Sequence, residues 1–330
     1  MRRWMLLVAL WLLVRPAFAE VAEVRIVRPA DLSALPLLVI EHEHLIEKQA
    51  DMMGLGTVAV RWAAPDKSGA VDAVNGGRSD LGLLELAAFV AAWDEQTGTP
   101  QELRAVAALQ QMPYVLVTRN PKVHTIRDFT DKNRIAVPAL KISGPALMLE
   151  MAAAAEWGPE HYGKLIPLMV ARPDAEAAAA LISGRGDIDT HFSRVPFVDD
   201  ELAGNTIRRV MDSFDVAGAH TSTVLVTTAK FRSANPQLSS SIVAALDEAQ
   251  DTIKTNPGAA AEIYVSMVKD ANITVEDLTD MIGDPDLAYT TVPAGVQRLA
   301  DFMHRTGRLK HKPGSWRDLF FPEVHNLPGS

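Results

Sequence analysis

The side chains best suited to ligand chemistry stand where an expected strand gives way to an expected helix. Residues 134–137 form a short apolar run that is typical of a buried strand. After the loop that begins at Pro138, Ser143 can cap a helix whose first turn contains Pro145, a residue without the N–H that would lack a partner there. Strong helix formers follow as far as Gly158, so the pattern predicts a helix start with free N–H groups that favour anions and polar ligand groups. The alternative is an ordinary, well-capped junction between a strand and a helix.

Two other strand ends carry candidate ligand contacts. Trp62 ends an expected strand over residues 57–62. Leu84 and Glu85 come at the end of the next expected strand. Because ligands of open α/β sheets gather at the carboxyl ends of the strands, these side chains could face a ligand. Trp62 could equally belong to the hydrophobic core, where large aromatic side chains are mostly buried.

The histidines predict no metal site. His42 and His44 both fall on an expected helix, where residues two apart point to different faces and cannot easily share an ion. We therefore interpret this stretch as a solvated helix face. His191 follows a very short expected strand over residues 187–190. It is as compatible with a buried, hydrogen-bonded histidine as with a ligand contact.

Residues 1–19 have the composition of an export signal. Met-Arg-Arg is followed by an apolar run over residues 4–14 and by Ala-Phe-Ala at residues 17–19. A basic start, a short apolar segment and small residues at a cleavage site are typical of a secretory signal peptide. The run is too short to span a bilayer, which takes roughly 20 apolar residues. We therefore expect a mature, periplasmic chain from Glu20 without membrane insertion, and no lipid anchor, since the chain has no cysteine.

Composition excludes several other classes of protein. The 330 residues are 48% apolar and 22% charged, which is enough for two domains with substantial cores. The absence of cysteine rules out disulfides, thiolate metal sites and cysteine nucleophiles. The net charge of −9 makes nucleic acid an unfavourable partner. The sequence contains neither a Gly-x-Ser-x-Gly nucleophile elbow nor a His-Glu-x-x-His zinc helix.

The elements that position the candidate residues follow one plan twice. In each half a helix, a turn, a short strand and a second helix follow each other, with Gly-Gly-Arg-Ser-Asp at residues 76–80 and Ser-Gly-Arg-Gly-Asp at residues 183–187. We predict two similar α/β units, each with a parallel sheet. The chain then turns helical, and apolar stripes predict helices over residues 239–254, 258–269, 274–282 and 294–306. We expect the aromatic-rich segment 315–322 to pack back onto a domain.

In order and spacing, these segments resemble the solute-binding proteins of ABC importers, in the nitrate, sulfonate and taurine branch that also includes thiamine-precursor binders. The resemblance covers nearly the whole mature chain. It rests on the two turns described above, each of which leads into Asp-Leu or Asp-Ile. Three further motifs contribute: Arg-Ile-Ala-Val-Pro from residue 134 with the following Ser-Gly-Pro, Pro-Tyr-Val-Leu-Val from residue 113, and Asn-Pro-Gly-Ala-Ala-Ala-Glu-Ile-Tyr from residue 256.

The resemblance implies the two-lobed, type II-like periplasmic binding protein fold, with two doubly wound α/β lobes and a helical C-terminal extension. The chain would cross between the lobes twice, near residues 113–119 and 218–226. Lobe one would then contain residues 20–115 and 226–330, and lobe two residues 116–225. A ligand would lie in the cleft between the lobes, and hinge closure would follow binding.

Carried over by position, the resemblance implies pocket candidates from both lobes and the second crossing: Ser33, Trp62, Leu84, Glu85, Ile142, Ser143, Gly144, His191, Phe192, His220 and Thr221. One of them departs from the family, which usually has a small or hydroxyl residue where Glu85 stands. A carboxylate that faced the cleft would repel a simple anion and suit an amine, a protonated ring nitrogen or another donor. Glu85 could instead point to solvent or cap its own helix. Lys141 could pair with an acidic ligand or remain hydrated.

We therefore expect a monomeric extracytoplasmic binding protein without metal or cofactor. It would capture a small organic solute with an acidic group, such as a sulfonate or carboxylate, and deliver it to the permease and ATPase of an ABC importer. A thiamine-precursor pyrimidine, which would suit Trp62 and Glu85, is an alternative solute, and sensing for a membrane receptor is an alternative role.

We expect no catalysis. The pyrimidine-synthesising enzymes of the same branch carry a cysteine-rich motif that this chain lacks. A pair of His191 and His220 could act as acid and base, but two histidines nominated from loops are weak evidence for an enzyme.

Overall fold

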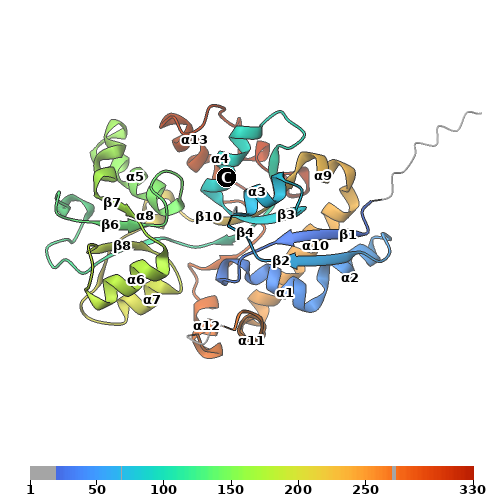
Figure 1. Ribbon diagram of the computed structural model, residues 1–330, viewed down its shortest axis with the longest axis horizontal. Coiled ribbons are helices and arrows are strands. Elements are labelled where there is room, and N and C mark those ends of the chain that lie inside the picture. Colours follow the sequence, from blue (N-terminus) through green and yellow to red (C-terminus); the bar gives the residue numbers. More distant parts are fainter. Residues whose placement is uncertain (1–19, 68, 270–272) are drawn as a thin grey trace, which may run out of the picture.

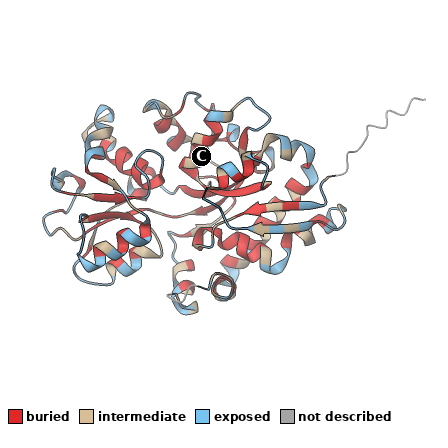
Figure 2. Ribbon diagram, in the orientation of Figure 1, coloured by how far each residue is buried: buried red, intermediate tan, exposed pale blue. Residues whose placement is uncertain are grey.

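The computed structural model describes residues 20–67, 69–269 and 273–330. The predicted signal peptide, residues 1–19, lies outside the described residues. Two β-sheets, each flanked by helices, form two lobes that lie side by side (Figure 1). Buried residues concentrate on the strands and on the helix faces that cover them (Figure 2). The predicted two-lobed α/β architecture is confirmed.

The larger sheet has six strands in the order β11-β4-β10-β3-β1-β2. They are β1 (Glu23–Val27), β2 (Ala59–Ala63), β3 (Leu81–Glu85), β4 (Leu103–Gln111), β10 (Thr221–Thr228) and β11 (Ala288–Tyr289). β1 is parallel to β2 and β3, whereas β10 lies antiparallel between β3 and β4. The prediction of a parallel sheet is wrong here, because β10 returns from the other lobe and enters the sheet at the edge where β3 ends. Thr223 of β10 therefore lies opposite Glu85 of β3.

The smaller sheet repeats this mixed arrangement in the order β7-β6-β8-β5-β9. Its strands are β5 (Val115–Thr118), β6 (Ile135–Val137), β7 (Met169–Ala171), β8 (Thr190–Ser193) and β9 (Arg208–Asp212). β6 is parallel to β7 and β8, while β5 is antiparallel to β8 and β9.

One strand of the smaller sheet begins later than predicted. The strand expected over residues 187–190 begins only at Thr190. The preceding Asp189 is held outside the strand, since its carboxylate accepts hydrogen bonds from the Asn133 side chain (2.6 Å) and the Arg134 N–H (3.0 Å). His191 therefore lies inside β8 and not at its end.

The chain passes from the larger sheet to the smaller one between β4 and β5, and it returns between β9 and β10. Every residue of β10 belongs to the larger sheet, so the predicted lobe boundary at residues 225/226 falls inside a strand. A boundary before Thr221 fits the sheets better. The limits of the lobes remain a prediction.

Helices lie on both faces of the larger sheet (Figure 1). They are α1 (Leu35–Glu43), α2 (Leu45–Met52), α3 (Gly69–Asn75), α4 (Leu86–Gln96), α9 (Ala229–Ala234), α10 (Pro236–Thr255), α11 (Pro257–Val268), α12 (Val275–Ile282) and α13 (Val296–Arg305). The expected helix that carries His42 and His44 is divided at His44, whose backbone is left-handed with φ 52°. The four helices predicted near the C-terminus are confirmed to within a few residues at each end.

The smaller sheet is flanked by α5 (Gly144–Trp157), α6 (Asp174–Ser183), α7 (Phe197–Leu202), α8 (Ser213–Ala217) and the 3₁₀ segment η3 (Pro159–Leu168). The start of α5 is as predicted. Ser143 caps the helix, Pro145 lies in its first turn, and Gly158 follows its last residue. This local sequence sets the point at which α5 meets the other lobe.

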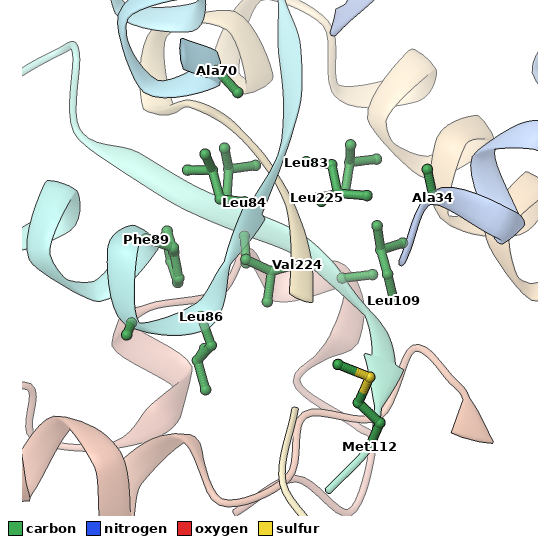
Figure 3. Packing of buried hydrophobic residues seen from close by; sticks show 14 of the residues in the cluster. Ala34, Ala70, Leu83, Leu84, Leu86, Phe89, Leu109, Met112, Val224 and Leu225 are labelled. Carbon is green, nitrogen blue, oxygen red and sulfur yellow. The ribbon is translucent and has the colours of Figure 1, made fainter. Parts of the chain in front are cut away.

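The hydrophobic core joins β3, β4 and β10 to the end of the chain. Leu84 and Leu225 belong to its packed side chains (Figure 3). Phe320 is fully buried, its ring centre lies 6.3 Å from that of Phe89 at an edge-to-face angle, and its backbone bridges to Ala105 of β4. The prediction that the aromatic C-terminal segment packs back onto a domain is confirmed.

Phe320→Ala should lower the free energy of unfolding by about 3–5 kcal/mol, because removal of a fully buried ring leaves a cavity against Phe89. Denaturant unfolding followed by circular dichroism measures the loss. Ile182, which is 47% exposed, provides the control, and Ile182→Ala should change the free energy by about 0.5 kcal/mol or less. Equally small losses in both variants would show that the C-terminal segment adds nothing to the folded core.

Candidate ligand-binding cleft

A cavity of about 300 Å³ lies between the two sheets. Both lobes line it, with the residues Pro29, Asp31, Ser33, Pro65, Ala70, Leu83, Leu84, Glu85, Tyr114, Pro138, Pro145, Asp174, Arg194, Ser222 and Thr223. A second cavity of about 160 Å³ adjoins it and shares Asp31, Ser33 and Arg194. The lining therefore combines carboxyl groups, hydroxyl groups and one guanidinium group on an apolar background of proline and leucine.

Strand ends bring the polar groups together. Glu85 ends β3, and Thr223 lies opposite it near the start of β10. In the other lobe Arg194 follows β8 and Tyr114 precedes β5, while Asp174 begins α6. The cavity thus forms at the carboxyl ends of β3 and β8, the place where open α/β sheets bind ligands.

Ser33 lines the cavity from η1 (Leu32–Ala34), a short 3₁₀ helix, and Asp31, which caps the start of that helix, lines it as well. The carboxylate of Asp31 accepts hydrogen bonds from the Ser33 N–H (3.0 Å) and from the Ser33 hydroxyl (2.5 Å). Because its proton is committed to Asp31, the Ser33 hydroxyl can offer a ligand only its oxygen lone pairs.

Arg194 stands at the end of a row of ionisable side chains that are hydrogen-bonded to one another. Its Nε donates to Asp174 (2.8 Å), Asp174 lies 3.5 Å from Nε2 of His191, and Nδ1 of that ring lies 2.8 Å from Glu201. Burial opposes the charge of the guanidinium, but Asp174 and Asp31 outweigh it and raise the pKa of Arg194. Burial would likewise lower the pKa of His191, but its two carboxylate partners raise it. Arg194 is therefore held positively charged in the cavity wall.

Most donors of Arg194 remain open to a ligand. A guanidinium group has five N–H donors. Within the described residues only Nε is engaged, in the hydrogen bond to Asp174. The two terminal nitrogens can therefore bind two oxygens of a carboxylate or sulfonate side by side, which is a strong and directional contact.

Glu85 reaches across the cleft. Its Oε1 accepts a hydrogen bond from the N–H of Gly144, the first residue of α5, and the Tyr114 hydroxyl bonds to the same carboxyl group. Burial raises the pKa of Glu85 to about 7, although the Gly144 N–H and Arg194 favour the charged form. A Cβ on Gly144 would lie 2.6 Å from Cζ of Tyr114, so only glycine allows this close approach. Glu85 neither points to solvent nor caps its own helix.

The start of α5 has no donor left for a ligand. Gly144 donates to Glu85, and Pro145 has no N–H. Ala146 donates to the Ser143 hydroxyl oxygen at 3.4 Å, and the next N–H donates to the Ser143 carbonyl at 3.0 Å. The free N–H groups predicted for this helix start are therefore engaged within the protein, because Glu85 arrives from the other lobe.

The structure separates the predicted site residues into three groups. Three line the cavity: Ser33, Leu84 and Glu85. Six are buried and do not line it: Ser143, Gly144, His191, Phe192, His220 and Thr221. Two lie apart from both cavities: Trp62 and Ile142.

Trp62 packs beneath a charged pair on lobe one. The guanidinium carbon of Arg28 lies 5.6 Å from the centre of the Trp62 ring, and Arg28 also pairs with Glu41. Ile142 is 37% exposed on the loop before α5. The neighbouring Lys141 is exposed as well.

His220 supports the cavity through Tyr114. Its ring stacks on that of Tyr114 with 5.6 Å between centres, and Phe192 meets the same tyrosine edge-on at 6.3 Å. Nε2 of His220 lies 2.9 Å from the Ser213 hydroxyl. Burial lowers the pKa of His220 to about 4, so the ring is neutral at neutral pH. The adjacent Thr221 accepts a backbone N–H at 3.0 Å.

Several polar lining residues were not identified from the sequence: Asp31, Tyr114, Asp174, Arg194, Ser222 and Thr223. Arg194 follows the carboxyl end of β8, and the same signal pointed to Glu85, so it could have identified Arg194. Thr223 lies near the start of β10, where that signal does not apply. No local pattern marks Asp174 as the partner of Arg194, since the contact joins two elements. Thr223 is also unusual because its buried hydroxyl has no hydrogen-bond partner among the described residues.

A second contact holds α5 to lobe one. Nη2 of Arg308, which follows α13, donates to both carboxylate oxygens of Glu150 at 2.6 and 2.7 Å. Glu150 is fully buried, and burial raises its pKa to about 6 against the effect of Arg308. α5 is therefore held at two points, by Glu85 at its start and by Arg308 further along.

Two α/β lobes joined by two chain crossings, with a polar cavity between them, define the fold of the periplasmic binding proteins. The chain belongs to the NMT1/THI5-like family, whose model matches residues 57–260. Comparison with curated protein sequences gives no match.

Solved structures of the same fold include three binding proteins. The periplasmic aliphatic sulphonate-binding protein SsuA from Escherichia coli is 16% identical with a TM-score of 0.68, and the alignment covers 92% of each chain. The nitrate-binding protein NrtA from Synechocystis PCC 6803 is 15% identical with a TM-score of 0.68, covering 92% of this chain and 87% of that one. A ligand-binding component of an ABC-type import system from Staphylococcus aureus is 15% identical with a TM-score of 0.64. The alignment covers 92% of this chain and 97% of that one.

The described residues offer neither a cluster suited to a metal ion nor a membrane-spanning helix. Among them, no group of three or more His, Asp or Glu side chains is arranged to hold a metal ion. No helix in the same part of the chain combines the length and the apolar character that a membrane span requires.

Glu85 should make stability fall as the pH rises. Its pKa of about 7 in the folded chain exceeds the ordinary 4.5, so the folded state binds this proton more tightly than the unfolded state. The associated stability is present below about pH 4.5 and is lost as the pH rises to about 7. At pH 8, Glu85→Gln should therefore unfold with a free energy up to about 3 kcal/mol above that of the wild type, whereas at pH 4 the two should be nearly equal.

Denaturant unfolding at both pH values measures this difference. Glu176→Gln, which changes an exposed acid on α6, is the control and should follow the wild type at both pH values. A difference between Glu85→Gln and the wild type that stays the same at pH 4 and pH 8 would show that Glu85 is not buried between the lobes.

Proposed function

We propose that this chain is the extracytoplasmic solute-binding protein of an ABC importer. It captures a small organic solute with an acidic group in the cavity between the lobes and delivers it to the permease and ATPase. The observation that carries the proposal is Arg194, a guanidinium group that Asp174 keeps charged in a cavity lined by both lobes. Its terminal nitrogens have no hydrogen-bond partner among the residues that the structure describes.

The volume of the cavity limits the size of the solute. About 300 Å³ lies at the lower end of the range of roughly 300–1,000 Å³ typical of ligand pockets. A carboxylate or sulfonate bound to Arg194 leaves room for a short organic part. That part would lie against the apolar lining, which includes Leu83, Leu84 and Pro145.

The similar structures support an acidic solute. SsuA is named for binding aliphatic sulphonates and NrtA for binding nitrate, and both ligands are anions. The Staphylococcus aureus protein is named as a component of an ABC-type import system, which supports the importer role proposed for this chain.

A site divided between two lobes suits capture and release. Glu85 and Thr223 come from one lobe, and Arg194 and Asp174 come from the other. A solute that touches both sets stabilises the closed arrangement, and separation of the lobes about the two crossings releases it. The export signal predicted over residues 1–19 would bring the chain to the periplasm, where such capture takes place.

The buried histidines favour binding without catalysis. His191 is 0% exposed and His220 is 2% exposed, and neither lines the cavity. A general acid or base must come within hydrogen-bond reach of the reacting group, which both side chains fail to do in this arrangement. A thiamine-precursor pyrimidine is the weaker solute candidate, because Trp62 lies apart from the cavity and cannot stack on it there.

A thermal-shift screen of the mature chain from Glu20 tests the proposal, since a solute that binds only the folded chain raises the Tm. The panel contains alkyl and aryl sulfonates, taurine, nitrate, aromatic carboxylates and pyrimidines. We expect a shift with organic acids, confirmed by calorimetry with no turnover. A shift with pyrimidines alone would favour thiamine-precursor binding. If no compound of the panel raises the Tm, the result would argue against an importer for these solutes and favour a sensor of another ligand.

Arg194→Lys should weaken binding of the organic acid found in the screen about 10- to 100-fold. Lysine keeps the positive charge but loses the paired donors, and a hydrogen bond to a charged group contributes about 1.5–3 kcal/mol. Titration calorimetry measures the change in Kd. Arg172→Lys is the control, because Arg172 pairs with the exposed Asp187 on the same lobe. Unchanged affinity in Arg194→Lys would mean that the acidic group binds elsewhere.

A further inference from the structure

The carboxyl group of Glu85 stands where an anion would bind. α5 has 14 residues, and Pro145 in its first turn lines the cavity. A helix start attracts anions through its N–H groups and its dipole. Here the N–H of Gly144 donates instead to Oε1 of Glu85, which comes from the other lobe. The protein's own carboxyl group thus takes the place of a ligand anion.

We propose that Glu85 is a specificity-determining residue of the cleft, which bars small inorganic anions from the start of α5 and directs the acidic group of the solute to Arg194. The inference rests on the proposed function, because it concerns the choice among solutes in the same cleft.

Several contacts fix Glu85 in this position. Its carboxyl group bonds to the Gly144 N–H and to the Tyr114 hydroxyl. Tyr114 is itself held, because its N–H donates to the Ser213 hydroxyl at 2.8 Å and its ring stacks on His220. Glu85 therefore behaves as a built part of the cavity wall and not as a side chain that swings freely into solvent.

Entry of an inorganic anion at α5 requires the removal of Glu85. The other N–H groups of the first turn are engaged or missing, so the Gly144 N–H is the donor that an anion would need. If an anion displaced the carboxyl group of Glu85 from the Gly144 N–H, that group would lose this hydrogen bond in a place with little water. Such a loss costs free energy. An organic acid on Arg194 leaves this hydrogen bond intact.

The surrounding charges strengthen the exclusion. The carboxyl group of Asp174, at the start of α6, acts electrostatically on Glu85, and that of Asp31, which caps η1, acts on Arg194. Arg194 is the basic residue of this lining, and Tyr114 is neutral. An ionised Glu85 adds a further negative charge, so an anion without the paired contact to Arg194 is repelled. Protonation of Glu85, whose pKa is about 7, should weaken this repulsion below neutral pH.

Thr223 provides an independent observation at the same point. It is 4% exposed, it lines the cavity, and it lies opposite Glu85 in the sheet. Within the described residues its hydroxyl has no hydrogen-bond partner, although buried hydroxyls normally have one. This unpaired hydroxyl indicates that a polar group of a ligand belongs beside Glu85.

Two variants separate the charge of Glu85 from the space it fills. Glu85→Gln keeps the shape and the acceptor oxygen but removes the charge, whereas Glu85→Ser vacates the start of α5. Glu176→Ser, which removes an exposed acid from α6, is the matched control. Circular dichroism and thermal unfolding establish that each variant is folded.

Titration calorimetry with sodium nitrate and with sodium butanesulfonate, at pH 8 and at pH 5.5, tests the proposal. At pH 8 the wild type and Glu176→Ser should bind nitrate at least tenfold more weakly than Glu85→Ser, with Glu85→Gln between them. At pH 5.5 the nitrate affinity of the wild type should rise, whereas that of Glu85→Ser should not change. At pH 8 butanesulfonate affinity should change less than nitrate affinity in the two Glu85 variants, and it should stay the same in Glu176→Ser.

Two outcomes would overturn the role of Glu85 and leave the proposed function standing. One is a folded Glu85→Ser that binds butanesulfonate but rejects nitrate as strongly as the wild type does. The other is a wild type that already binds nitrate at pH 8 as tightly as Glu85→Ser. If none of the proteins binds either anion, the proposed function for these solutes fails, and the specificity role of Glu85 fails with it.

Discussion

The guanidinium group of Arg194 remains charged inside the cleft because the buried carboxylate of Asp174 is hydrogen-bonded to it and Asp31 adds to the effect. An unpaired ion in such a place costs several kcal/mol. Asp174 offsets the charge of Arg194, and the ring of His191, whose pKa its two acidic partners raise, lies between Asp174 and Glu201. This row of side chains connects β8, α6 and α7, so the charge at the cavity depends on the packing of the whole second lobe. The basic group is thereby positioned before a solute arrives, which lowers the cost of binding.

The contacts between the lobes depend on two carboxyl groups, of which Glu85 is half-buried and Glu150 fully buried. Glu85 holds the start of α5, and Glu150 on the same helix holds Arg308. Burial raises the pKa of both carboxyl groups, which means that the ionised forms are costly in this place. Because desolvation offsets much of the attraction in a buried ionic contact, such contacts align the lobes more than they hold them closed. A solute that bridges the lobes can therefore supply the free energy of closure.

Local signals in the sequence predicted elements better than contacts. Ser143 and Pro145 marked the start of α5, because capping depends on neighbours along the chain. The repeated turns and the resemblance predicted the two lobes and the family, and both are confirmed. The donors expected to be free at α5 are engaged by Glu85, which precedes Gly144 by 59 residues. No local pattern carries such a contact, and which of the predicted residues bind a solute remains a prediction.

The order of the strands explains why two residues predicted from the same sequence signal differ in the structure: Glu85 lines the cavity and Trp62 does not. Trp62 and Glu85 both stand near the carboxyl end of a strand. β2, which carries Trp62, is an edge strand beside β1 and lies far from the chain crossings in the sheet order. β3, which carries Glu85, lies beside β10, and β10 begins where the chain returns from the other lobe. The order of strands thus places the last side chain of β3 in the cleft, whereas β2 reaches the cleft through Pro65, in the loop that follows the strand, and not through Trp62. Residue types along the chain do not contain that order, so the sequence could nominate strand ends but could not choose between them.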